Sequence, residues 1–345
     1  MSVEAMTDTL LRLLSNADID WLIACGNRHT LAPGQCLLHP SMDSDWVSII
    51  VEGSLGESVA AAQGAVDEPG LIDELNQGDI VGLNPLLDGP NLTMVTALRS
   101  TLVLSLPTAQ LQAKLSEDVA FAAHFYHAIA LQLSDRLRRL FEHRDRLRFW
   151  ESGNDVLTVF GELRDSDIDW LTAFGAIETI PAERVLLQAG RPVESLYILL
   201  EGQMAMSASQ GSFNPLALCF RGLESAGDRP VVATLSQGSL PGLMSFLDFR
   251  PLPVTVRTTT ESLIFAVPRQ TLATKLQVDE SFASRFYRVI ALGILGQLQT
   301  VSMGLVAPGS PMDDEELDMD DLQQVSEGAK KFGWMLAQLG VNHRG

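Results

Sequence analysis

The chain contains two copies of one long sequence pattern. Residues 17–22 read Ala-Asp-Ile-Asp-Trp-Leu, and residues 166–171 read Ser-Asp-Ile-Asp-Trp-Leu. The same offset of 149 residues carries the pair Glu52-Gly53 onto Glu201-Gly202. A repeat of this length predicts two globular domains of one architecture, because the units of solenoid proteins are about 20 to 50 residues long.

The repeat sets the domain boundaries that we predict. The first domain covers residues 1–150 and the second covers residues 151–306, followed by an acidic linker and an amphipathic tail helix over residues 307–345. The offset between the copies grows from 149 to 160 across residues 207–233, which predicts a longer loop there in the second copy.

Each copy carries strand-like alternations followed by a longer helical pattern. Apolar residues alternate at Leu102, Leu104 and Leu106, as in strands with one buried face. Residues 120–149 instead place apolar side chains at helical spacing. We therefore predict an α+β, mainly β fold: two jelly-roll or β-barrel domains in tandem, each with flanking helices, and a C-terminal helix.

Composition and charge narrow the classes of partner. Hydrophobic residues make up 46% of the chain, enough for packed cores, and 43 acidic against 24 basic residues give a net charge of −19. Such a surface repels phosphate backbones and anionic lipids, so nucleic-acid binding is not expected. The expected partners are proteins with basic faces, or small ligands.

Cysteine usage and the N-terminal segment predict a cytoplasmic protein. Cys25, Cys36 and Cys219 form no CxxC pair, and no basic flank or apolar signal opens the chain. Residues 289–312 lack charged side chains and are long enough to cross a bilayer. We interpret them as a helix end packed against protein and expect no integral span, with peripheral membrane contact as the alternative.

Several motifs resemble the cyclic-nucleotide-binding domain of the catabolite activator protein and its relatives. The most specific is Leu-Tyr-Ile-Leu-Leu-Glu-Gly at residues 196–202, and the resemblance covers about residues 14–150 and 163–305. It implies a jelly roll followed by a long helix that commonly mediates dimerisation. It also implies a phosphate-binding cassette, in which an arginine neutralises the cyclic phosphate and a glutamate holds the ribose hydroxyl.

The cassette is degenerate in both copies. The glutamate position, after Gly82 and Gly242, falls on Leu83 and Leu243, and the arginine position falls on Asn91 and Leu252. Losing this counter-charge removes a contact worth about 1.5 to 3 kcal/mol, so ordinary cyclic-nucleotide binding is not expected. In the second copy Arg250 and Arg257, with the hydroxyl of Thr255, are alternative anion contacts, unless both arginines simply face solvent.

No pattern predicts a catalytic or metal site, and we expect neither an enzyme nor a bound cofactor. His124 and His127 lack a third ligand and are interpreted as a surface or interface pair. Six arginines between Arg136 and Arg148 are interleaved with acidic residues, which predicts a solvated helix face. The segment after residue 305 has acidic residues near its start and carries one short helical pattern, so a DNA-reading element is not expected.

Two apolar helical segments predict protein contacts. The segment 286–305 has lost nearly every charge, and the tail carries apolar residues at three-four spacing. The tail docks either on its own domain, for example on the uncharged segment, or on a separate partner. We expect a homodimer or heterocomplex, with these candidate interface residues: Val289, Leu292, Leu295, Leu322, Val325, Phe332, Leu336 and Leu339.

The paired copies, the acidic segment and the tail are also similar to cyanobacterial proteins described as bacteriocin-type transport-associated. This resemblance implies a peptide-export transporter as the partner. We therefore interpret the chain as a non-enzymatic regulatory or scaffold protein with degenerate nucleotide pockets. The alternative is a sensor that binds a cyclic nucleotide or another small anion in the second barrel. A catalytic barrel would need a bound metal.

Overall fold

The computed structural model describes residues 10, 12–40, 45–59, 71–87, 93–142, 150–152, 160–208, 231–306 and 319–341. The chain divides into two compact units, and each is described by itself. The first unit contains residues 1–140 and 283–291, and the second contains residues 141–282 and 292–345. Residues 283–291, which the sequence places in the second domain, therefore group with the first. Most of the longer loop predicted at residues 207–233 lies outside the described residues.

The first unit is a jelly roll of two antiparallel four-stranded sheets, ordered β1-β8-β3-β6 and β2-β7-β4-β5. Its apolar interior is one cluster between the sheets that includes Leu31, Ile50 and Val103. The elements are α2 (Asn16–Cys25), β1 (Asn27–Leu31), β2 (Cys36–Leu38), β3 (Trp46–Glu52), β4 (Ser54–Val59), β5 (Leu71–Asn76), β6 (Ile80–Val81), the 3₁₀ turn η1 (Asn84–Leu86), β7 (Thr93–Ala97), β8 (Thr101–Pro107), α3 (Thr108–Glu117) and α4 (Val119–Glu142).

The second unit repeats this arrangement. Its sheets are ordered β10-β16-β12 and β11-β15-β13-β14-β9, where β9 pairs in parallel with β14. The elements are β9 (Trp150–Ser152), α6 (Asp165–Phe174), β10 (Ala176–Ile180), β11 (Val185–Leu187), β12 (Ser195–Glu201), β13 (Met204–Ala208), β14 (Val231–Leu235), α8 (Leu243–Asp248), β15 (Val254–Thr258), β16 (Ser262–Pro268), α9 (Arg269–Val278), α10 (Glu280–Val306) and α11 (Met319–Gln338).

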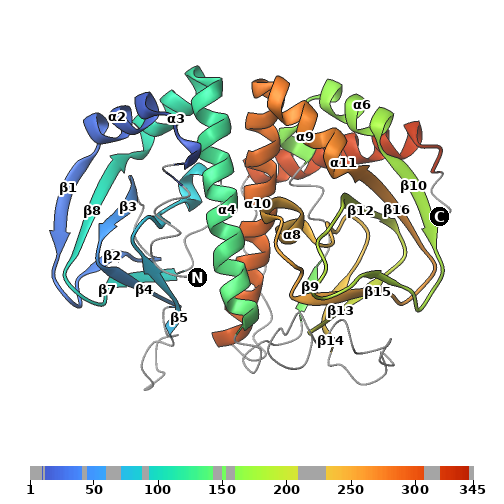
Figure 1. Ribbon diagram of the computed structural model, residues 1–345, viewed down its shortest axis with the longest axis horizontal. Helices are drawn as coiled ribbons and strands as arrows, with labels where there is room; N and C mark the ends of the chain where they lie inside the picture. The colour runs from blue at the N-terminus through green and yellow to red at the C-terminus, as the bar shows by residue number, and fades with distance from the viewer. Residues whose placement is uncertain are drawn as a thin grey trace. The chain divides into compact units, whose positions relative to one another are not determined.

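In both units short helices gather at one end of the strands (Figure 1). The repeated Asp-Ile-Asp-Trp-Leu motif begins α2 and α6. There the carboxylate of Asp18 accepts a hydrogen bond from the Ser15 backbone N–H at 2.8 Å, and that of Asp167 accepts one from Arg164 at 2.9 Å. These bonds satisfy N–H groups that a helix start otherwise leaves unpaired, which explains why the motif recurs.

The predicted fold class is confirmed. The turn glycines of the Glu-Gly motif, Gly53 and Gly202, both have a left-handed backbone, with φ of +103° and +96°. A side chain strains this conformation, and glycine does not. Among the described helices, none combines the length and hydropathy that a membrane span needs.

Candidate functional site

The cassette of the second barrel is closed by apolar side chains. Gly242 has a φ of +79° and starts α8, so the loop makes the turn that the family pattern implies. At the two degenerate positions, Leu243 is 2% exposed and Leu252 is 3% exposed. The Leu252 backbone N–H donates to the carbonyl of Arg191 at 3.0 Å. An anion at this position would lie against buried hydrocarbon instead of a guanidinium.

The alternative cations of the second barrel already have carboxylate partners. Arg250 donates from Nε to Asp248 at 3.0 Å and is half-buried, and burial lowers its pKa. Arg257 donates from Nη1 to Glu183 at 3.3 Å. The hydroxyl of Thr255 accepts a hydrogen bond from the backbone N–H of Ala189 at 3.2 Å. Each of these three side chains therefore forms a hydrogen bond within the chain.

Arg269 is a structural residue of this cassette that the sequence analysis missed. Its Nη2 donates to the carbonyls of Ser245 at 3.0 Å and Phe246 at 2.6 Å, and its guanidinium lies 4.1 Å from the ring centre of Phe249. These contacts hold the C-terminal half of α8, where carbonyl groups lack helical partners. Arg269 opens α9, and nothing in its local sequence shows that it reaches back to α8.

The first barrel has a similar cassette without a described arginine position. Gly82 has a φ of +80°, and Leu83, which precedes η1, is 3% exposed. Asn91 lies outside the described residues. Leu83, at the position where the resemblance implies a glutamate, is therefore buried.

A buried charge network joins α4 to the strands of the first barrel. Arg136 pairs with Glu57 of β4, and its Nε lies 3.6 Å from Asp73 of β5. Arg139 binds Asp73 through two bonds, from Nε at 2.9 Å and from Nη2 at 2.8 Å. The prediction of a solvated arginine face is wrong for Arg136, which is 7% exposed, because its partners lie on distant strands and not on its own helix.

Burial and neighbouring charges shift ionisation in this network. Burial opposes the charge of Arg136, but the carboxylates, Glu57 first, outweigh it and raise its pKa. Asp79 is fully buried, and burial raises its pKa to about 6. Its Oδ2 accepts from the Asn76 backbone N–H at 2.8 Å. The side-chain amide of Gln132 pairs with both backbone groups of Ile80 at 3.0 Å, so α4 is tied to the barrel by neutral bonds as well.

The histidines of α4 have separate partners. His124 Nδ1 lies 3.4 Å from Asp18, whereas His127 stacks on Tyr287 with ring centres 4.0 Å apart. Burial lowers the pKa of His127 to about 4. The two imidazoles therefore contact different elements of the first unit.

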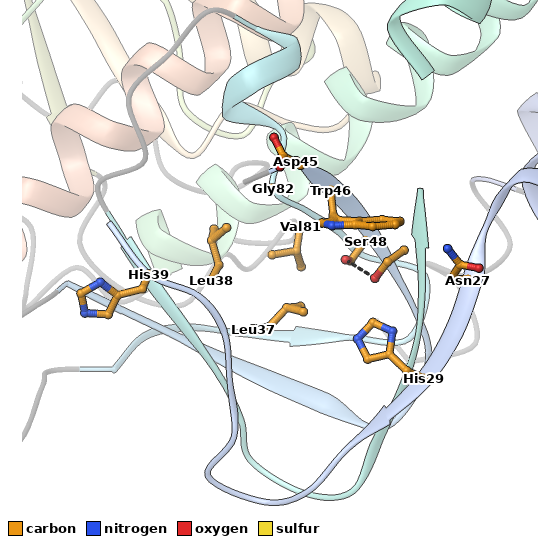
Figure 2. Close-up of a pocket in the computed structure, with 11 residues that line it drawn as sticks. Asn27, His29, Leu37, Leu38, His39, Asp45, Trp46, Ser48, Val81 and Gly82 are labelled. Carbon is orange, nitrogen blue, oxygen red and sulfur yellow. Dashed lines mark hydrogen bonds between the residues drawn. The ribbon is translucent and has the colours of Figure 1, made fainter. Parts of the chain in front are cut away.

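A pocket of about 530 Å³ opens into the first barrel (Figure 2). Its floor carries the hydroxyls of Ser48 and Ser105, hydrogen-bonded to each other at 2.8 Å. The pocket is lined by Asn27, His29, Leu37, Leu38, His39, Asp45, Trp46, Ser48, Val81, Gly82 and Ser105. The sequence analysis missed it. The signal was a difference between the copies, since Ser48 stands where the second copy has Tyr197.

The candidate interface residues are largely buried within one chain. Val289 and Leu295 are 2% and 7% exposed, and Leu292 is half-buried. On the tail helix, Phe332 and Leu336 are 7% and 3% exposed. Leu339 is half-buried, and the side chains of Leu322 and Val325 lie outside the described residues.

The tail helix α11 docks on its own unit, where it lies against α6. The ring of Phe332 meets that of Phe160 edge to face at 6.0 Å. Lys331 donates to the carbonyls of Gly161 and Leu163 at 2.9 and 2.7 Å, and Gln338 donates to Asp169 at 2.8 Å.

Comparisons with known proteins give one family and several solved structures. The regulatory domain of Toxoplasma gondii protein kinase A, solved with cAMP, is 14% identical with a TM-score of 0.29, over 79% of this chain and 92% of that one. The regulatory subunit of a cAMP-independent protein kinase A from Trypanosoma cruzi, bound to guanosine, is 16% identical with a TM-score of 0.27, over 80% and 83%.

A shorter structure aligns with part of the chain. The N-terminal domain of a transcriptional regulator from Streptomyces coelicolor A3(2) is 24% identical with a TM-score of 0.32, over 42% of this chain and 96% of that one. No curated protein sequence matches the chain. Within the second barrel, residues 177–279 match the family model of the cyclic nucleotide-binding domain.

Proposed function

We propose that the chain is a non-enzymatic regulatory or scaffold protein whose cyclic-nucleotide cassettes no longer take a cyclic phosphate. The observation that carries this proposal is Leu252, which is 3% exposed at the position where the resemblance implies an arginine. The nearest candidate cations, Arg250 and Arg257, are paired with Asp248 and Glu183. An incoming phosphate would have to break these pairs without gaining the missing bidentate contact.

Calorimetric titration with cyclic AMP and cyclic GMP tests this proposal. We expect no binding tighter than about 1 mM, because a lost charge-assisted contact weakens affinity roughly tenfold to a hundredfold. The variants Arg250→Ala and Arg257→Ala should give the same null titration. Micromolar binding that Arg250→Ala abolishes would support the alternative function, an anion sensor in the second barrel.

The proposed partner is another protein. The net charge of −19 favours a partner with a basic face, and the resemblance of the tail suggests a peptide-export transporter. A homodimer is the second form of this proposal, and Leu292 and Leu339 are candidate interface residues that keep partial exposure.

Light scattering during size-exclusion chromatography tests the dimer. At micromolar concentration we expect a mass about twice the 37.5 kDa of one chain, since stable dimers bury apolar helix surface. The double variant Leu292→Glu with Leu339→Glu should shift the peak toward one chain. A wild-type peak with the mass of a single chain at micromolar concentration would refute the dimer.

A further inference from the structure

The pocket of the first barrel lies where the second barrel places an aromatic side chain. Strand β3 pairs Ser48 with Ser105 of β8, and strand β12 pairs Tyr197 with Ala266 of β16. The two registers are equivalent, because Trp46 faces Pro107 in the first barrel and Ser195 faces Pro268 in the second. Tyr197 therefore occupies the position that Ser48 holds in the pocket.

The surroundings of Tyr197 repeat the lining of the pocket. Its hydroxyl is hydrogen-bonded to Ser195, the counterpart of Trp46. Burial first, and then the charges of Glu178 and Glu194, raise the pKa of this hydroxyl. Glu178 and Glu194 are the counterparts of His29 and Asp45 at the offset of 149 residues. In the second barrel a half-buried tyrosine thus stands at the strand position where the first barrel has Ser48 and the pocket.

The first barrel supplies binding groups around this hollow. Ser48 and Ser105 are 3% and 4% exposed, and their mutual bond uses one of their two O–H groups. This leaves one O–H group and several lone pairs of the serine pair outside their mutual bond, on two residues that line the pocket. Figure 2 shows the rings of Trp46 and His29 on one side and the apolar side chains of Leu37 and Val81 on the other. Aromatic and aliphatic walls with a few convergent polar groups are typical of small-molecule sites.

The charges of the lining define the class of ligand. Asp45 is its one acidic residue, and the eleven lining residues include no arginine or lysine. A phosphate or carboxylate would therefore meet no permanently charged cation among these residues, whose basic groups are the imidazoles of His29 and His39. The volume of about 530 Å³ exceeds that of a single phenol ring and falls within the range of about 300 to 1,000 Å³ that holds drug-sized ligands.

We propose that this pocket binds an uncharged aromatic molecule that carries a phenol-type hydroxyl. The ring replaces the missing tyrosine side chain between Trp46 and Leu37, and the hydroxyl pairs with Ser48 and Ser105. A polar extension reaches toward Asn27 at the rim. Gly82 belongs both to the lining of this pocket and to the cassette. The proposal goes beyond the proposed function, because the ligand is not a cyclic nucleotide.

Ligand-detected NMR with the full chain and N-acetyltyrosinamide tests the proposal. This probe is uncharged and carries a phenol and two amides. We expect a dissociation constant of about 0.1 to 1 mM, given the affinity that each atom of a small ligand contributes. N-acetylphenylalaninamide lacks the hydroxyl and should bind about tenfold more weakly, since it brings no hydroxyl to hydrogen-bond with the buried serine pair. Equal affinities for the two probes would overturn the proposal. The absence of any binding of N-acetyltyrosinamide at a few times its expected dissociation constant, which is at most about 1 mM, would overturn it as well.

Variants separate the pocket from other surfaces. Ser48→Tyr restores the side chain of the second barrel and should abolish binding. The matched control Ser116→Tyr places the same change on the exposed face of α3 and should leave binding unchanged. If Ser48→Tyr fails to fold by circular dichroism, the milder Ser105→Ala should weaken the tyrosine probe to the level of the phenylalanine probe. Wild-type affinity in a folded Ser48→Tyr protein would refute the site.

Competition distinguishes this proposal from the proposed function. Cyclic AMP at millimolar concentration should leave probe binding unchanged. Displacement of the probe by cyclic AMP would mean that the pocket is a nucleotide site. Cyclic AMP binding without displacement would contradict the proposed function and leave the aromatic site intact.

Discussion

Replacing Arg136 with methionine lowers the free energy of unfolding of the first unit by about 3 to 5 kcal/mol. The arginine pairs with Glu57 and lies near Asp73, and its side chain is 8% exposed. Its removal leaves the buried carboxylate of Glu57 without its counter-charge, whereas Asp73 keeps the two bonds from Arg139. Urea denaturation, combined with hydrogen exchange at the amides of β4 and β5, measures the loss in this unit separately from the other.

The matched control is Arg139→Met on the same helix. Arg139 makes a two-pronged bond to Asp73, but its side chain is 28% exposed and water compensates part of the loss. We expect about 1 to 2 kcal/mol for this variant. Equal losses for the two variants would show that burial does not set the strength of the network. Adding Glu57→Gln to Arg136→Met should recover part of the stability, because the unpaired charge is then gone.

Replacing Phe332 with alanine detaches the tail helix α11 from α6, at a cost of about 3 to 5 kcal/mol. Phe332 is 7% exposed and meets Phe160, and Met335 beside it is fully buried. The helix contains Gly328 and Gly333, each of which costs about 1 kcal/mol relative to alanine. Its order therefore depends on this docking. Hydrogen exchange should show protection lost across the described part of α11.

Trp334→Ala is the control for that prediction. Trp334 is an aromatic residue of the same helix, but it is 36% exposed. Its removal should change stability by less than about 1 kcal/mol and keep the helix protected. If Trp334→Ala released the helix as fully as Phe332→Ala, packing against Phe160 would not be what holds it.

Local patterns were enough to predict the fold. The Asp-Ile-Asp-Trp-Leu repeat predicted two copies of one architecture, and the helical spacing from Phe121 to Leu140 matched the buried stripe of α4. The alternation predicted at Leu102, Leu104 and Leu106 describes strand β8 less well. Leu104 and Leu106 are buried, but so are Val103 and Ser105, because this strand is covered on both faces.

The sites could be predicted only where one position decides the chemistry. Leu83, Leu243 and Leu252 predict a degenerate cassette, because at each position a leucine stands where the resemblance implies a charged residue. The ion pair between Arg136 and Glu57 could not be predicted from the sequence, because the two residues are 79 positions apart and no local pattern links them. The pocket depended on comparing Ser48 with Tyr197 across the repeat, and a lone serine in a strand gives no such signal.

The burial of the α4 network also determines how the first unit responds to ionic strength. Dissolved ions weaken attraction between charges that water reaches, such as Lys114 with Asp118 at 2.6 Å on the surface. They do not penetrate to Arg136, Glu57 and Asp79. The stability of the contacts between α4 and the strands of the first barrel therefore depends little on salt concentration.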